Sequence, residues 1–238
     1  MNLLLVELEK LRTVRTTWLL LVVAVLGPLP IAIAILTQTD RLDRAPQEVL
    51  GLIVLTALLA AALGASACAR EFELRTITTA FTLEPRRERI VAAKAAAAAI
   101  VGAAAALLCV AFLLSLTAIW LSSSDAPWPW TSGETLSAIA GAVIVTVTLA
   151  VAGTGFGGVT RHVGSAITLF VLVYFVLEGV LVARLGFWSD YGITAAGSTL
   201  TEPGVEHALS YVGALAVVVG LSLAVLAGGI AVVRRSDV

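Results

Sequence analysis

The chain has 238 residues, of which 59% are hydrophobic and 13% are charged, whereas a soluble domain carries charge on about a quarter of its positions. Its mean hydropathy is +1.01, and the charges fall in short clusters between apolar runs of about 20 residues, the length of a bilayer-spanning helix. This composition excludes an ordinary water-soluble domain, and the formal net charge of -1 predicts no nucleic acid partner.

The apolar runs predict an all-α polytopic membrane protein, a single transmembrane domain over residues 1–238. Helices are expected because backbone amides in hydrocarbon must be satisfied within the segment, and no run alternates polar and apolar residues as a barrel strand does. Pro28 and Pro30 predict a kink in the first span. The six predicted spans cover residues 17–37, 47–69, 91–121, 135–159, 163–184 and 209–233.

Before the first span, the stretch from Leu3 to Val14 has the pattern of a short amphipathic helix. Leu4, Leu8 and Leu11 recur at helical spacing among charged residues. Two interpretations remain open. The stretch is either an interfacial helix or a charged flank that merely orients the first span.

The loop of residues 70–94, between the second and third spans, is too patterned for a linker. Leu74, Ile77 and Phe81 lie three and four residues apart, which predicts a short helix with one apolar face that ends before Pro85. Such a face, framed by charges, suits insertion into a groove on a partner protein. A membrane-surface helix whose arginines meet anionic headgroups is the alternative.

Glycines at the end of the fourth span fit two motifs. Gly153, Gly155 and Gly158 match G-x-G-x-x-G, but no strand precedes them, so a dinucleotide site is not expected. Gly153 and Gly157 form G-x-x-x-G on one helix face, which predicts close packing against a neighbouring helix. Neither lysine lies in a phosphate-binding loop, so this chain is not expected to bind ATP.

Catalytic chemistry has little support in the sequence. His162 and Ser165 lie close together at a predicted membrane edge, and an intramembrane enzyme built on them is a minor hypothesis. His207 is predicted to lie on the other side of the membrane, so the two histidines do not meet at a metal. No catalytic, cofactor or metal site is therefore predicted, and the chain is not expected to be an enzyme.

Glu178 is interpreted as the one ionisable side chain deep in a span. A charge near the centre of a membrane helix costs about 2.5 to 3.5 kcal/mol on insertion scales, so a compensating interaction is expected. Contact with a substrate, coupling to a proton and a hydrogen bond to a neighbouring helix remain open. The outer loop of residues 185–208 that follows either dips into the membrane or caps the bundle, or is a plain surface loop.

Basic residues set the predicted topology. Twelve lie on one side and three on the other, with Lys94 counted in the loop, so both termini and the loop of residues 70–94 are predicted to be cytoplasmic. Two lysines against thirteen arginines, with abundant small aliphatic residues, suggest a GC-rich bacterial genome and hence a bacterial plasma membrane. The twelve are Lys10, Arg12, Arg15, Arg70, Arg75, Arg86, Arg87, Arg89, Lys94, Arg161, Arg234 and Arg235, and the three are Arg41, Arg44 and Arg184.

The loop of residues 70–94 resembles that of ABC-2 type ATP-binding-cassette transporter permeases, especially the bacterial two-component exporters. These often show an acidic residue, Gly-Thr, a Thr-rich apolar stretch, Pro-Arg-Arg, and Ala-Lys opening the third span. Arg75 departs from the pattern, because the family commonly has glycine there. The matching residues are Glu71, Thr76, Thr78, Thr79, Pro85, Arg86, Arg87, Ala93 and Lys94.

The resemblance implies the ABC-2 (type V exporter) fold, with an N-terminal connecting helix and a coupling helix over residues 71–84. It also implies a dimer with a second copy or a homologous permease, and a cytoplasmic ATPase subunit that binds ATP and magnesium. The cargo expected from the apolar walls is an amphipathic drug, peptide or lipid. The alternative is a non-transporting membrane anchor or sensor partner. The expected docking residues are Glu71, Leu74, Arg75, Thr76, Ile77, Thr79, Phe81, Glu84, Pro85, Arg86, Arg87 and Arg89.

Overall fold

The computed structural model describes residues 3–39, 41–77, 82, 84 and 86–235, and these residues form helices and no strands. Among these described residues, six helical segments are long and apolar enough to cross a membrane, so the chain is a multi-pass membrane protein, as the composition predicts. The segments are Arg15–Gln38 (α2 and α3), Ala45–Glu73 (α4 and α5), Arg87–Ser123 (α7), Ser132–Thr160 (α8), Val163–Arg184 (α9, η1 and α10) and Tyr211–Arg235 (α13).

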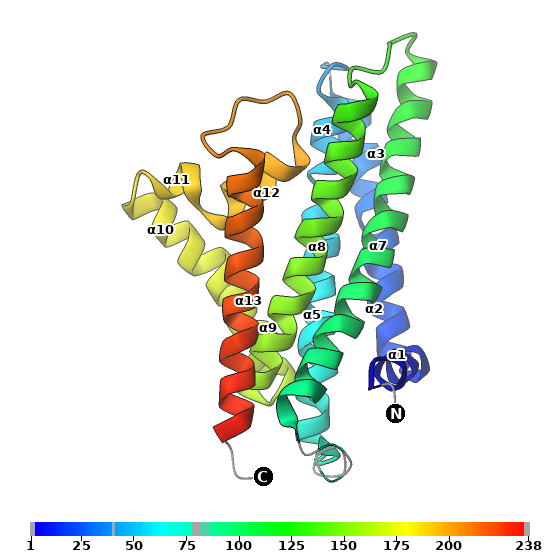
Figure 1. Cartoon of the computed structure of the whole chain (residues 1–238). Coiled ribbons are helices and arrows are strands. Elements are labelled where there is room, and N and C mark those ends of the chain that lie inside the picture. The colour runs from blue at the N-terminus through cyan, green and yellow to red at the C-terminus, as the bar shows by residue number, and fades with distance from the viewer. Residues whose placement is uncertain (1–2, 40, 78–81, 83, 85, 236–238) are drawn as a thin grey trace.

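The spans run side by side along one axis (Figure 1). Helix α1 (Leu3–Thr13) lies across one end of this bundle, where α13 also ends and where α5 connects to α7. This end is called the terminal end below. The connection from α7 to α8 lies at the opposite end.

The first span is divided at Gly27 into α2 (Arg15–Leu26) and α3 (Pro28–Gln38). The division falls where a kink is predicted, because each proline lacks the N–H that would continue the helical hydrogen bonds. Gly27 itself keeps helical dihedral angles and donates its N–H to the carbonyl of Val23 at 2.8 Å. Helix α3 then packs on α4 (Ala45–Leu50) and α7.

Helix α8 is the centre of the bundle, in contact with α5 (Ile53–Glu73), α7, α9 (Val163–Val171) and α13. Its glycines allow this. A Cβ on Gly153 would overlap the carbonyl oxygen of Ala61 on α5, and one on Gly155 would lie 2.6 Å from the carbonyl oxygen of Val225 on α13. The predicted close packing through Gly153 and Gly157 is confirmed, since Gly157 meets Ala65 of α5 in the same way.

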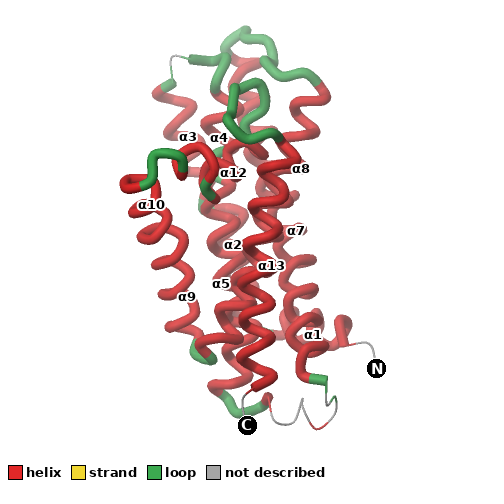
Figure 2. The backbone as a smooth tube through the Cα atoms, turned by 60° about the vertical axis from the view of Figure 1, so that its left-hand side comes forward, coloured by secondary structure: helices red, strands yellow, loops and turns green. Residues whose placement is uncertain are grey.

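The fifth span leans away from the bundle toward the opposite end (Figures 1 and 2). Helix α9 packs on α5 and α8. The π-helix η1 (Leu172–Leu177), by contrast, buries none of its residues. Helix α10 (Glu178–Arg184) completes the span.

The outer loop returns to the bundle through two short helices, α11 (Trp188–Tyr191) and α12 (Ile193–Thr201). Helix α12 packs on α8 and α13, and Leu200 is 1% exposed beside Gly141 of α8. Gln47 of α4 donates to the carbonyl of Pro203 at 3.2 Å. The loop therefore packs on the bundle and is not a plain surface loop.

Candidate functional site

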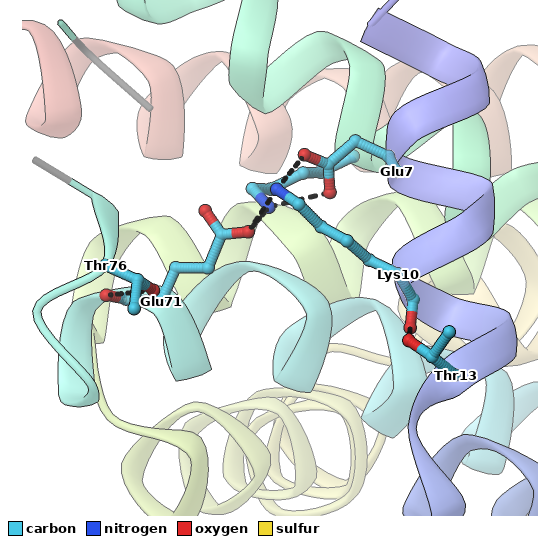
Figure 3. Close-up of polar contacts among 6 residues, drawn as sticks. Glu7, Lys10, Thr13, Glu71 and Thr76 are labelled. Carbon is cyan, nitrogen blue, oxygen red and sulfur yellow. Dashed lines mark hydrogen bonds and ion pairs between the residues drawn. The ribbon is translucent and has the colours of Figure 1, made fainter. Parts of the chain in front are cut away.

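A cluster of four charged side chains joins three helices at the terminal end (Figure 3). Lys94 of α7 lies 2.8 Å from Glu7 Oε2 on α1 and 2.6 Å from Glu71 Oε1 on α5. Lys10 of α1 lies 2.8 Å from Glu7 Oε1 and 2.8 Å from Glu71 Oε1. Two lysines and two carboxylates thus alternate, and the cluster is electrically neutral. It is called the charge cluster below.

The position of Lys94 corrects its assignment to a loop. Helix α7 already begins at Arg87, about two turns earlier, and the Lys94 side chain is 1% exposed. Lys94 is therefore, like Glu178, an ionisable side chain that the protein buries within a helical segment long enough to span a membrane. A buried ammonium is tolerated when carboxylates surround it with good geometry, and removing one partner strongly destabilises such a pair.

Lys10 is the most exposed member of the cluster, with 44% of its side chain accessible. Partial burial lowers the pKa of Lys10, but the hydrogen bonds and the negative charges of Glu7 and Glu71 outweigh it, so the pKa is raised above its ordinary value. Lys10 therefore stays charged across the physiological pH range, and the cluster keeps its balance.

The end of α5 also contacts two further helices, through Phe72 and Glu73. Glu73 Oε1 accepts a hydrogen bond from the backbone N–H of Val163, the first residue of α9, at 2.7 Å. The guanidinium of Arg161, at the end of α8, lies 5.7 Å from the centroid of the Phe72 ring, a cation–π distance. The end of α5 therefore holds α1, α7, α8 and α9 together.

Helix α5 ends in a turn that glycine would suit. The N–H of Arg75 donates to the carbonyl of Phe72 at 3.1 Å, and that of Thr76 donates to the carbonyl of Glu71 at 3.0 Å. This is the Schellman pattern, which needs a left-handed residue after the cap. Arg75 supplies it with φ of 56°. The position at which the resembled family commonly has glycine is thus one where the backbone favours glycine.

The expected docking residues do not share one face. Leu74 is 70% exposed, whereas Ile77 is 2% exposed, so the apolar stripe predicted from their spacing is not continuous. The reason is the left-handed turn at Arg75, which breaks the helical register between them. Thr79, Phe81 and Pro85 lie outside the described residues.

Four more of the expected docking residues flank the start of α7 or lie in its first turn: Glu84, Arg86, Arg87 and Arg89. The backbone N–H of Arg86 donates to Glu84 Oε1 at 3.3 Å, and Arg89 lies 3.9 Å from Glu84 Oε2. Arg87 reaches the carbonyl of Val233 near the end of α13 at 3.4 Å. The start of α7 therefore contacts the last span as well.

Glu178 lies at the junction between the fifth span and the returning helices, with 5% exposure. Trp188 Nε1–H donates to Oε2 at 2.8 Å, and the N–H and the hydroxyl of Thr194 donate to Oε1 at 3.0 and 3.2 Å. Among the described residues, no ion pair involves this carboxylate. Of the roles left open, the contacts favour a structural hydrogen-bonding one.

Replacing Glu178 by alanine is expected to loosen α11 and α12, because three donors lose their acceptor and a buried unpaired donor costs about 1 to 3 kcal/mol. Amide hydrogen exchange of residues 188–201 in detergent should become faster, while exchange in α5 stays as in the wild type. Glu178→Gln keeps an oxygen acceptor and should lie between the two. Unchanged protection of α12 in the alanine variant would contradict this role.

His162 contacts Glu73 of α5 rather than Ser165. His162 Nδ1 lies 3.5 Å from Glu73 Oε1 and its side chain is 70% exposed. In the described part of the chain no hydrogen bond joins His162 to Ser165. The contact with Glu73 makes His162 part of the turn between α8 and α9.

Comparison with models of known protein families, with curated proteins and with solved structures finds no match to this chain.

Proposed function

We propose that this chain is the permease subunit of a two-component transporter, driven by an ATPase on a separate polypeptide that docks at the terminal end. The observation that carries the proposal is the convergence of contacts on the end of α5. The segment that resembles a coupling helix begins at Glu71, which is held by Lys10 and Lys94. A force on this segment therefore acts on α5 and on its partners together.

The contacts that would transmit the docking force from α5 to its neighbouring helices are short and polar. Glu71 and Glu73 point to different neighbours, α1 and α7 for the first and α9 for the second. Charge-assisted hydrogen bonds are shorter and about twice as strong as hydrogen bonds between neutral groups, so these contacts suit the transfer of a force between helices. ATP and magnesium belong to the partner subunit, and the role of this chain is to convert the docking force into rigid-body motion of its spans.

The remaining parts of the proposal follow from the resemblance and from composition. The permease works as a dimer, with a second copy or with a homologous chain. It lies in a bacterial plasma membrane with the terminal end in the cytoplasm, because the basic residues gather there. An amphipathic drug, peptide or lipid suits its apolar walls better than an ion does.

Leu74→Asp tests docking without touching the core. Leu74 is 70% exposed at the terminal end, so the substitution is expected to leave folding intact and to remove an apolar contact with the ATPase. Pull-down of the tagged protein in mild detergent, followed by an ATPase assay of the eluate, should show bound activity for the wild type and at least a tenfold loss for the variant, since an apolar contact of this size is worth about 1.5 to 3 kcal/mol.

Val205→Asp is the matched control, because Val205 is an apolar residue with 46% exposure in the connection between α12 and α13. It should retain the full amount of ATPase. A wild-type protein that is intact and retains no ATPase would overturn the transporter proposal, and the anchor or sensor interpretation would then lead.

A further inference from the structure

A groove at the terminal end lies beside the charge cluster. It opens between α1, the last turns of α5 and the first turns of α7, and its volume is about 950 Å³. This lies at the upper end of the range for small-molecule sites, which are apolar with a few polar groups. Apolar side chains that line it include Leu3, Val6, Leu11, Val14, Ala67 and Ile90.

The acidic side chains that line the groove are already engaged. Glu7 and Glu71 belong to the charge cluster, and Glu73 accepts the N–H of Val163. Glu84 accepts the N–H of Arg86 and lies near Arg89. Glu71 Oε2 accepts no hydrogen bond but is buried, so each of the four described carboxylates that line the groove already has a partner on the protein.

Arg70 is the exception among the charged residues of the groove. Its Nη2 donates to the hydroxyl of Thr16 at 3.1 Å, and within the described residues no carboxylate forms an ion pair with it. A guanidinium holds five N–H donors in a planar fork that matches the oxygens of a phosphate. Of the two described cations that line the groove, Lys10 is thus paired with carboxylates and Arg70 is not, and the group that complements the Arg70 guanidinium is an anion.

The groove lies at the level where an amphipathic ligand changes from polar to apolar surroundings. Thr17 of α2 lines it, and the next residue, Trp18, is 55% exposed with its indole N–H on the carbonyl of Arg12 at 2.8 Å. Tryptophan prefers the boundary between headgroups and hydrocarbon. A ligand with a phosphate at Arg70 then places an apolar part against Val6 and Leu11.

We infer that this groove binds one anionic phospholipid, with its phosphate on Arg70 and an acyl chain along the apolar wall of α1. The apolar wall is what favours a lipid over a free phosphate compound. The inference does not depend on the proposed transport function, since an anchor or sensor protein would bind the lipid in the same way. It adds a role for α1, whose apolar side then contacts lipid as well as protein.

Native mass spectrometry of the purified chain, with phosphatidylglycerol or phosphatidylcholine added, tests this. The wild type is expected to retain one phosphatidylglycerol, at about tenfold higher affinity than phosphatidylcholine. Arg70→Gln should lose that preference, because a hydrogen bond to a charged group accounts for a factor of about ten or more. Arg41→Gln removes the same charge from an exposed site in the connection between α3 and α4 and should behave as the wild type.

A second variant, Val6→Trp, fills the groove without changing its charge and should also displace the lipid. Equal retention of phosphatidylglycerol by Arg70→Gln and the wild type would overturn the inference. So would equal binding of the two lipids, or displacement of the lipid by glycerol phosphate at the same concentration, which would identify a site for the phosphate alone. A bound peptide in place of the lipid would overturn it as well.

Discussion

Lys94→Met is expected to lower the free energy of unfolding by about 3 to 5 kcal/mol, the usual consequence of breaking a buried ion pair. Methionine fills a similar volume, so the loss comes from electrostatics and not from a cavity. Glu7 and Glu71 would remain with Lys10 as their only cation in the cluster. Thermal unfolding in detergent, followed by circular dichroism, measures the change.

The double variant Glu71→Leu with Lys94→Met separates charge imbalance from packing. It removes one positive and one negative charge, and Glu7 keeps its pair with Lys10 on α1. Replacing a buried ion pair by apolar residues is often neutral or stabilising, so the double variant should recover most of the stability that the single variant loses. A double variant less stable than Lys94→Met alone, or a single variant as stable as the wild type, would contradict this account.

The attachment of α1 also depends on the charge balance of the cluster. Helix α1 contributes Lys10 and Glu7, three residues apart, so it adds no net charge to the charge cluster. Without α1, Lys94 would still face Glu71 at the end of α5. The charge cluster is therefore balanced with and without α1, while docking of α1 gives Lys94 a second carboxylate.

The membrane-spanning character of this fold could be predicted because length and hydropathy depend on composition alone. In a chain with so little charge, runs of about 20 apolar residues can form few structures other than membrane-spanning helices. The packing of Gly153 and Gly157 was also predictable, since a small residue every fourth position permits close approach of helices. The spans and the close packing can both be predicted without identifying the neighbouring helix.

The charge cluster could not be predicted with the same ease, because its members come from three separate helices. Two signals were present in the sequence. Glu7 lies three residues after Leu4 and four before Leu11, so it shares their face of α1, where an unpaired carboxylate would be costly. Lys94 likewise begins an alanine-rich run without other charges. Both point to buried partners, but sequence spacing does not identify Glu71 as one of them.

The prediction of one apolar stripe through Leu74 and Ile77 was wrong for a local reason. Residues three apart share a face only in a continuous helix. Here α5 ends before Ile77, because Arg75 adopts a left-handed conformation. A non-glycine residue in that conformation is uncommon and is maintained by surrounding contacts. Here the backbone hydrogen bonds to Phe72 and Glu71 supply them.

Gly153→Val is expected to lower the free energy of unfolding by about 3 kcal/mol, at the upper end of the usual cost of overpacking. The new side chain would meet the backbone of Ala61, which cannot rotate away as a flexible side chain can. The substitution should separate α5 from α8. The resulting shift of α5 should also displace Glu71 at its end and so weaken the charge cluster. Thermal unfolding in detergent measures the loss, and hydrogen exchange should locate it in α5 and α8.

Gly228→Val supplies the matched control on α13, because a Cβ at Gly228 would meet nothing within 4 Å. The same chemical change on an open helix face should leave stability near that of the wild type, since valine has a higher helix propensity than glycine. Similar losses in both variants would mean that the effect comes from valine in the helix and not from its neighbour. A loss confined to Gly153→Val would assign the lost stability to the close approach of α5 and α8.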